Sequence, residues 1–167
     1  MGSSHLHIRR TGEGRFAPHN GNGLLRLPGD SQHYRCTPGL ARSGLTCVLW
    51  ELNQVEEGAG GTLFIDGSHK TAFLAPDSVM TSDSPLWSTY SCPEGSLVTF
   101  AEGTSHSAKP WESSERDRVC IFSRYNYVHS RWHNWEPPDG LVETMPQKRR
   151  TRFRGVHVQG NRVDATE

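Results

Sequence analysis

Two segments of the sequence combine a short β-type pattern with a polar loop that carries a histidine, and they restrict the fold more than any other feature. Residues 62–65 are Thr-Leu-Phe-Ile, and the loop that follows them contains His69. Residues 96–100 are Ser-Leu-Val-Thr-Phe, and the next loop contains His106. Short runs of β-branched and aromatic residues between glycine and proline turns predict strands. A chain built from such units is expected to form an all-β fold of the jelly-roll type.

Two longer runs extend the expected sheets. Residues 45–52 are apolar on both faces apart from two positions, which predicts a central strand. Residues 119–127 form a further strand pattern, with Arg118 just before it and Arg124 within it. The composition agrees with this interpretation. The chain has 17 glycines and 10 prolines, and 34% of its residues are hydrophobic, which suits short strands joined by many turns.

The length of 167 residues fits a single domain, 1–167. We expect its core over about residues 33–127 and a C-terminal extension over about residues 128–167. In that extension, residues 141–150 are expected to form a helix that Pro146 interrupts, because proline lacks the backbone N–H that a helix interior needs.

Charge and composition argue against several classes of partner. The 18 basic and 18 acidic residues cancel, so no overall field favours nucleic acid or an anionic membrane. The basic run 148–154 lacks an interleaved aromatic platform and is expected to be a solvated tail. No apolar run is long enough to cross a bilayer. The four cysteines form no Cys-x-x-Cys pair, and Cys47 and Cys120 lie within strand patterns, which favours buried thiols and a cytoplasmic location.

One chemistry accounts for the second histidine loop and the basic strand together. Many non-heme Fe(II) oxygenases hold the metal with two imidazoles and one carboxylate and leave the other positions open. A 2-oxoglutarate cosubstrate also needs a cation for its distal carboxylate, and arginine binds carboxylates through paired hydrogen bonds. His106 lies just beyond one strand, and Arg118 begins a later one. These two residues are therefore candidates for a metal ligand and a cosubstrate-binding residue.

Three blocks of the sequence resemble the phytanoyl-CoA dioxygenase family. They are residues 49–70, which end in Gly-Ser-His-Lys, residues 95–111, which contain His106, and residues 115–125. The resemblance covers about residues 45–127. It implies a double-stranded β-helix fold, Fe(II) and 2-oxoglutarate as cofactors, and hydroxylation of a small organic substrate with molecular oxygen.

The resemblance also suggests roles for individual residues. His106 matches the distal iron ligand of the family. Arg118 matches the arginine that binds 2-oxoglutarate, and Arg116 is the alternative because the length of the preceding loop differs.

The second iron-binding histidine is harder to place, because the family's His-x-Asp motif is absent from the chain. His7 is the first choice, although residues 1–32 show little strand periodicity, and His33 is the next. His19, in His-Asn-Gly, offers only a neutral amide where the carboxylate would be. The carboxylate is then missing, supplied from elsewhere, or replaced by water or a halide. Two other functions stay open: a non-catalytic jelly-roll binding module, and a truncated family member that has lost its metal site.

The remaining histidines have structural interpretations. His69 is expected to fix its loop together with Ser68. His129 and His133 lie near two tryptophans and are expected to belong to an aromatic surface cluster. Substrate contacts are expected from the loops over residues 71–94 and 128–140, whose mixed composition favours no substrate class.

Overall fold

The computed structural model describes residues 2–19, 33–71, 75–130, 136–153, 155–158 and 161–162. Its strands are β1 (Ser3–Arg9), β2 (Tyr34–Thr37), β3 (Leu40–Ser43), β4 (Leu45–Glu51), β5 (Gly61–Ile65), β6 (Trp87–Ser88), β7 (Leu97–Ala101), β8 (His106–Lys109), β9 (Arg118–Asn126), β10 (His157–Val158) and β11 (Asn161–Arg162). Its helices are η1 (Ser68–Lys70), η2 (Asp77–Val79), α2 (Leu141–Thr144), α3 (Gln147–Arg150) and η3 (Thr151–Phe153). His133 and its neighbours Trp132 and Trp135 lie outside the described residues.

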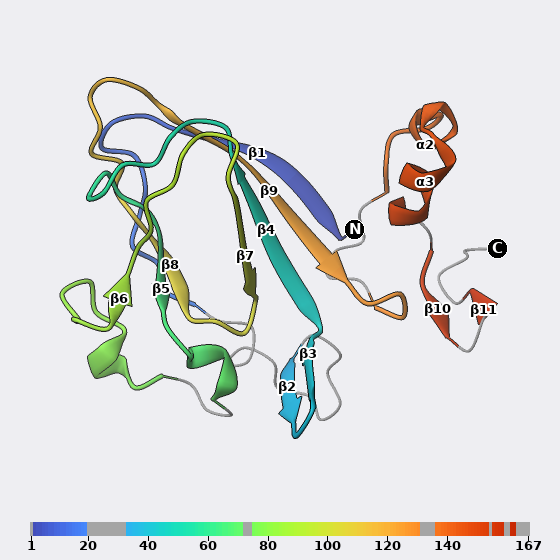
Figure 1. Ribbon diagram of the computed structural model, residues 1–167, viewed down its shortest axis with the longest axis horizontal. Helices are drawn as coiled ribbons and strands as arrows, with labels where there is room; N and C mark the ends of the chain where they lie inside the picture. The colour runs from blue at the N-terminus through green and yellow to red at the C-terminus, as the bar shows by residue number, and fades with distance from the viewer. Residues whose placement is uncertain are drawn as a thin grey trace.

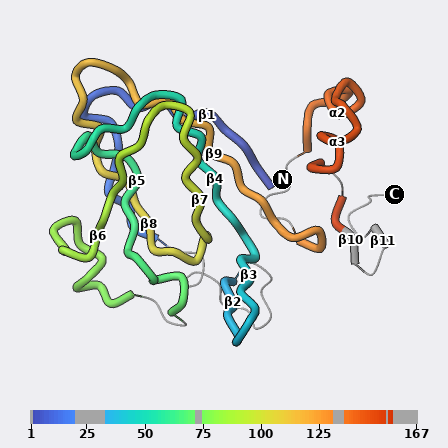
Figure 2. Tube along the Cα trace, in the orientation of Figure 1, coloured from blue at the N-terminus to red at the C-terminus, as the bar shows by residue number. Residues whose placement is uncertain are grey.

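Two antiparallel sheets face one another (Figure 1). The larger sheet has the strand order β1-β9-β4-β7, and the smaller one has the order β6-β5-β8. The tube view shows the same two layers, joined by loops at both ends (Figure 2). A hairpin of β2 and β3 lies beside one end of the layers. This arrangement confirms the mostly β, double-stranded β-helix architecture that the sequence predicts.

The strands expected from the sequence are present with small shifts at their ends. Residues 45–52, 62–65, 96–100 and 119–127 correspond to β4, β5, β7 and β9. The central position expected for β4 is confirmed, because it pairs with β9 on one side and with β7 on the other. Only its inner face is fully buried, and Trp50 on the outer face is 45% exposed.

The strand β1 was not expected, because its apolar side chains face solvent and its polar side chains face the interior. It pairs along its whole length with β9, so the larger sheet begins at Ser3 rather than near residue 33. His7 and Arg9 are half-buried and line the inner pocket, while Leu6 and Ile8 on the other face are 58% and 50% exposed. Hydrophobic periodicity predicts strands whose apolar side faces the core. Here the polar side lines the interior, which points to a binding site there.

The interior between the sheets is rich in polar groups. Its buried apolar side chains include Leu45, Cys47, Leu49 and Cys120, and a small separate cluster is formed by Val55, Ala59 and Trp111. The charged or titratable side chains buried with them are Glu51, Glu102, His106 and Arg118. Burial of such groups is unfavourable unless each finds a partner. Their partners therefore define the functional centre of the molecule.

The C-terminal segment lies beyond the ends of β1 and β9 in Figure 1. The expected interruption of its helix is confirmed, since α2 ends before Pro146 and α3 begins after it. Lys148, Arg149 and Arg150 are exposed, as expected for a solvated basic run. Among the described residues, no helix combines the length and apolar character needed to span a membrane.

Candidate metal centre

His106 begins β8 and points into the interior, where it is 4% exposed. Its Nδ1 lies 2.7 Å from the carbonyl oxygen of Thr104. A carbonyl only accepts hydrogen bonds, so Nδ1 carries the proton and the lone pair resides on Nε2. The ring of Phe100 packs edge-on against the imidazole at 5.0 Å. Burial lowers the pKa of His106, although the charge of Glu102 acts in the opposite direction. The lowered pKa favours the neutral imidazole that metal ligation requires.

His19 lies beside His106 and is held in the same way. The two residues form an isolated antiparallel bridge, with backbone N–O distances of 2.9 and 3.0 Å. The Nδ1 of His19 lies 2.9 Å from the carbonyl oxygen of Ala17, which again leaves Nε2 with the lone pair. The ring centroids of the two histidines are 4.1 Å apart. Metal-binding histidines commonly donate their second N–H to a carbonyl in this manner.

Glu102 brings a carboxylate to the same place. It lies in the turn between β7 and β8, four residues before His106, and is 4% exposed. Its Oε1 lies 4.0 Å from Nε2 of His106. Its Oε2 accepts a hydrogen bond from Sγ of Cys47 at 2.7 Å and lies 3.9 Å from Nε of Arg124. One oxygen is therefore fixed by neighbours while the other faces the histidines.

The three side chains together fit a divalent metal. One ligand atom from each of His19, Glu102 and His106 lies within 4.8 Å of the others, and no other group of this kind occurs in the described part of the chain. Two imidazoles and one carboxylate are the donors preferred by non-heme Fe(II). The outer contacts with Ala17, Thr104 and Cys47 orient these donors, as in established metal sites.

The cluster brings together some of the residues proposed from the sequence and not others. His106 belongs to it, and its neighbour is His19, which the sequence did not favour because no acidic residue follows it. His7 faces the same pocket from β1 but is not part of the three-residue group. Its role as an iron ligand stays a prediction. His33 precedes the β2–β3 hairpin and does not belong to the group either.

Glu102 is the residue that sequence reasoning missed. A search for His-x-Asp places the carboxylate two residues after the first histidine. In the fold, the carboxylate that lies beside the two histidines comes instead from the turn before the second one, four residues ahead of His106. The available signal was an acidic residue in the turn that ends in a candidate ligand. Acidic residues are common in turns, so this signal is weak on its own.

The two histidines of the cluster open onto a pocket of about 200 Å³. His19 and His106 line one part of it, and Thr62 and Arg118 line another. Its basic side chains include four arginines, which are Arg9, Arg15, Arg118 and Arg124. Burial, together with the charges of His5, Arg9, Arg118 and Arg124, lowers the pKa of His7 on the same wall to about 4. The pocket is therefore suited to a small dianion.

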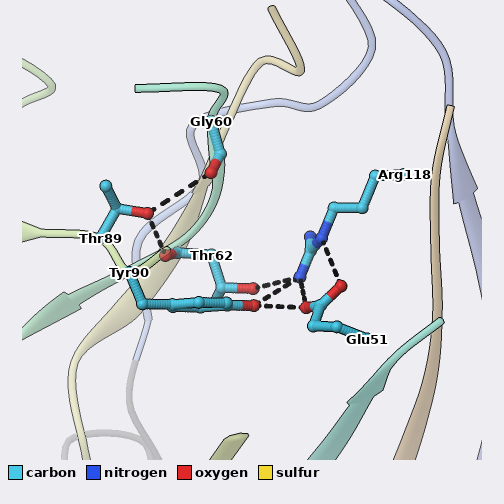
Figure 3. Close-up of polar contacts among 6 residues, drawn as sticks. All are labelled: Glu51, Gly60, Thr62, Thr89, Tyr90 and Arg118. Atoms are coloured by element: carbon cyan, nitrogen blue, oxygen red, sulfur yellow. Dashed lines mark hydrogen bonds and ion pairs between the residues drawn. The ribbon is translucent and has the colours of Figure 1, made fainter. Parts of the chain in front are cut away.

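Arg118 reaches this pocket from within a buried network (Figure 3). Its Nη2 and Nε donate to the two carboxylate oxygens of Glu51 at 2.5 and 3.2 Å. Nη2 also lies 3.1 Å from the hydroxyl of Thr62 and 2.8 Å from that of Tyr90, which itself donates to Glu51. Burial alone lowers the pKa of Arg118, but the bonds and charge of Glu51 and Tyr90 raise it overall, so the guanidinium stays charged.

The orientation of Arg118 leaves one edge of the guanidinium for a ligand. Its hydrogen bonds with described residues use Nε and Nη2, and none of them uses Nη1. The alternative residue, Arg116, forms an exposed ion pair with Glu56 at 3.2 Å and does not line the pocket. The assignment of Arg118 to 2-oxoglutarate stays a prediction, and of the two arginines it is the one placed for that role.

The first histidine loop supports the site without entering it. The hydroxyl of Ser68 donates to the carbonyl of Ile65 at 2.6 Å and accepts the N–H of Ser105 at 2.7 Å. The ring of His69 packs edge-on against Tyr34 at 4.5 Å. These contacts agree with the structural role expected for this loop, since they fix the backbone immediately before His106.

The chain is similar to known proteins in its fold and not in its sequence. No protein-family model matches the chain, and no curated protein matches it. HygX from Streptomyces hygroscopicus, solved with nickel and 2-oxoglutarate bound, superposes with a TM-score of 0.62 at 19% identity, over 78% of this chain and 59% of HygX. ThoJ, a non-heme monooxygenase solved with nickel, gives 0.53 at 18% identity, over 80% of this chain and 46% of ThoJ.

A third structure belongs to the same group. SnoN, a non-heme α-ketoglutarate-dependent epimerase from nogalamycin biosynthesis, gives a TM-score of 0.50 at 17% identity, over 75% of this chain and 46% of SnoN. Identities this low demonstrate a shared fold alone. This chain spans less than two thirds of the length of each of these proteins. The chain therefore has the double-stranded β-helix fold of non-heme, 2-oxoglutarate-binding proteins.

Proposed function

We propose that the protein is an Fe(II)- and 2-oxoglutarate-dependent oxygenase that hydroxylates a small organic substrate, as the resemblance to the phytanoyl-CoA dioxygenase family implies. The observation that carries the proposal is the group of His19, Glu102 and His106, whose two histidines line a pocket that also has four arginines in its wall. A metal-ligand set and a dianion site next to each other are what this cosubstrate chemistry requires.

The metal would be held by Nε2 of both histidines and by the carboxylate of Glu102. Fe(II), when bound, supplies the open positions and the redox chemistry that activate molecular oxygen. The chain's own contribution is orientation. The carbonyls of Ala17 and Thr104 fix the tautomer of each imidazole, and Cys47 fixes the carboxylate.

The cosubstrate would lie in the arginine-lined pocket. Arg118 offers the unused edge of its guanidinium, and Glu51 prevents that guanidinium from rotating by binding its other two nitrogens. HygX, which was solved with 2-oxoglutarate bound, and SnoN, which is α-ketoglutarate-dependent, support the same use of the fold here. The pocket's surplus of positive groups favours a ligand with two carboxylates.

The first test is binding of the metal and the cosubstrate by the unaltered chain. Calorimetry with Ni(II), a redox-inert substitute for Fe(II), is expected to give one equivalent, and 2-oxoglutarate is expected to bind more tightly once the metal is present. At a hundredfold excess over the dissociation constant, a ligand stabilises the fold by about 2.7 kcal/mol. That corresponds to a rise in Tm of roughly 5–10 °C for a chain of this size.

Turnover completes this test. With Fe(II) and air, the protein is expected to release carbon dioxide from 2-oxoglutarate, and a chelator is expected to stop the release. If Ni(II) does not bind in stoichiometric amounts and the Tm does not change, the proposal is wrong. The non-catalytic binding module would then be the better interpretation of the fold.

Cys47 provides a second prediction, because its thiol holds the carboxylate of Glu102. Burial, followed by the charge of Glu102, raises the pKa of Cys47 well above its usual range, so the thiol stays protonated and donates to Oε2. Replacing Cys47 by alanine is expected to weaken Ni(II) binding by about tenfold, the lower end of the range for outer-shell contacts. Cys47→Ser keeps a donor and is expected to retain most of the affinity.

The matched control for this prediction is Cys36→Ala, since Cys36 is exposed on β2. Calorimetric titration of the three variants checks the order of affinities, and circular dichroism checks that each is folded. Equal affinities for Cys47→Ala and Cys47→Ser would show that the thiol does not position Glu102.

A further inference from the structure

Among the described residues, the buried polar atoms that lack a hydrogen-bond partner gather in one region of the molecule. In the described part of the chain, the side-chain atoms that are buried without a hydrogen bond are Ser3 Oγ, Arg124 Nε, Asn126 Nδ2, Asn126 Oδ1 and Ser130 Oγ. In folded proteins nearly all buried polar groups form hydrogen bonds, and each group left without one costs about 1–3 kcal/mol of stability. A cluster of them marks a place where a polar ligand or ordered water completes these bonds.

The position of these residues connects them to the metal centre. Arg124 pairs across the strands with Ser3, and its Nε lies 3.9 Å from Glu102. Asn126 follows two residues later on β9 and therefore points to the same side of the sheet as Arg124. It pairs with Leu45, which is fully buried on the inner face of β4. The unpartnered groups thus continue the inner wall outward from the metal centre.

A separate pocket of about 180 Å³ lies at this end of β9. Its walls include Asn126, Ser130 and the backbone of Gly2, together with Tyr127 and Thr151. Gly2 has no side chain, and a Cβ there would overlap the amide oxygen of Asn126. The close approach of the two residues fixes the amide at the edge of the pocket, where it is available to a ligand.

The chemistry of the free groups defines the ligand. In this pocket Asn126 offers an amide donor and a carbonyl acceptor, and Ser130 offers a hydroxyl that both donates and accepts. A carboxylate only accepts hydrogen bonds and would leave the amide oxygen unpaired, while a hydrocarbon would leave all of these groups unpaired. Hydroxyl groups can both donate and accept, so a molecule with several neighbouring hydroxyls satisfies the set.

We propose that the pocket at the end of β9, with Asn126 and Ser130 as its binding residues, holds a hydroxyl-rich, carbohydrate-like part of the substrate. The inference rests on the proposed function, because it takes the occupant to be the molecule oxidised at the neighbouring metal centre. The pocket would orient that molecule by its hydroxyl groups, and the part to be oxidised would extend past Arg124 toward Glu102 and the histidines.

The test uses sucrose and trehalose as probes and octanoate as an apolar, anionic comparison. Saturation-transfer NMR with the full chain, loaded with 2-oxoglutarate so that the arginine-lined pocket is filled, is expected to show saturable binding of the two sugars and little of octanoate. Asn126→Asp, which has the same shape but lacks the amide donor, and Ser130→Ala are each expected to weaken sugar binding by about tenfold. Ser78→Ala in the exposed helix η2 is the matched control and is expected to leave it unchanged.

The outcomes separate this inference from the proposed function. Circular dichroism establishes that each variant is folded, and Ni(II) binding to the unaltered chain is measured in the same samples. If Ni(II) and 2-oxoglutarate bind but neither sugar does, or if octanoate binds as well as the sugars, the inference falls while the proposed function stands. Sugar binding that Asn126→Asp and Ser130→Ala leave unchanged also overturns it, because the unpartnered groups then serve water alone. Sugar binding that depends on both residues in a chain that takes up no metal overturns the link to oxidation.

Discussion

Replacing His106 by alanine is expected to abolish stoichiometric metal binding, with Ni(II) affinity reduced by more than about a hundredfold. The loss of a direct ligand should exceed the effect of altering an outer contact, which reaches about a hundredfold at most. His106 is the best-placed ligand because it is 4% exposed, its Nδ1 is committed to Thr104, and its Nε2 faces Glu102. Calorimetric titration with Ni(II) measures the effect.

The matched control is His129→Ala, since His129 is exposed and its ring stacks on Tyr127 away from the cluster. That variant should bind Ni(II) as the unaltered chain does. Two further variants decide which residue is the second histidine ligand of the metal. His19→Ala is expected to weaken binding as strongly as His106→Ala, and His7→Ala is expected to have little effect. The reverse order would show that His7 is the second histidine ligand and that His19 is not.

Glu102→Gln distinguishes a ligand from a simple ion-pair partner. Glutamine preserves the size of the side chain and removes its charge, so the loss of a coordinating carboxylate should weaken metal binding. Metal affinity is expected to fall markedly in this variant while the fold is retained. An affinity equal to that of the unaltered chain would show that Glu102 merely accompanies His106 and that the third ligand lies elsewhere.

The fold could be predicted well wherever apolar side chains face the interior. The strands β4, β5, β7 and β9 each bring apolar residues to the interior, and the sequence pattern finds them to within one or two residues. The strand β1 escaped this reasoning because Leu6 and Ile8 face outward, while His7 and Arg9 face inward. A strand that lines a polar pocket does not have the pattern of a strand that covers a core.

The site could be predicted only where the family resemblance has a counterpart for the residue. His106 and Arg118 match that resemblance in two blocks that follow one another in the chain, and both line the same pocket. The contact between Glu102 and the histidines arises from the way the turn after β7 folds back, and the spacing of residues in the sequence does not predict that geometry. The pairing of Arg118 with Glu51 links two residues 67 positions apart, which a single sequence does not reveal.

The Glu51–Arg118 pair yields the largest expected change in stability. Both side chains are buried, with Glu51 fully inaccessible to solvent. Replacing Glu51 by alanine leaves the guanidinium buried without a counter-charge, which typically costs about 3–5 kcal/mol. A loss of this size would lower the Tm by roughly 10 °C, as measured by circular dichroism or calorimetry. The matched control is Glu56→Ala, which breaks an exposed pair with Arg116 and should change stability by less than about 1 kcal/mol.

A double variant separates the structural role of this pair from its role in cosubstrate binding. Glu51→Leu with Arg118→Met removes both charges, and replacement of a buried ion pair by apolar residues is often neutral or stabilising. The double variant should therefore be more stable than Glu51→Ala, and it should still bind Ni(II), because the metal-site residues are unchanged. It should nevertheless lose most of its affinity for 2-oxoglutarate, since the unused edge of Arg118 is gone. If the double variant is stable and binds 2-oxoglutarate normally, Arg118 serves the fold alone, and the remaining arginines of the pocket bind the dianion.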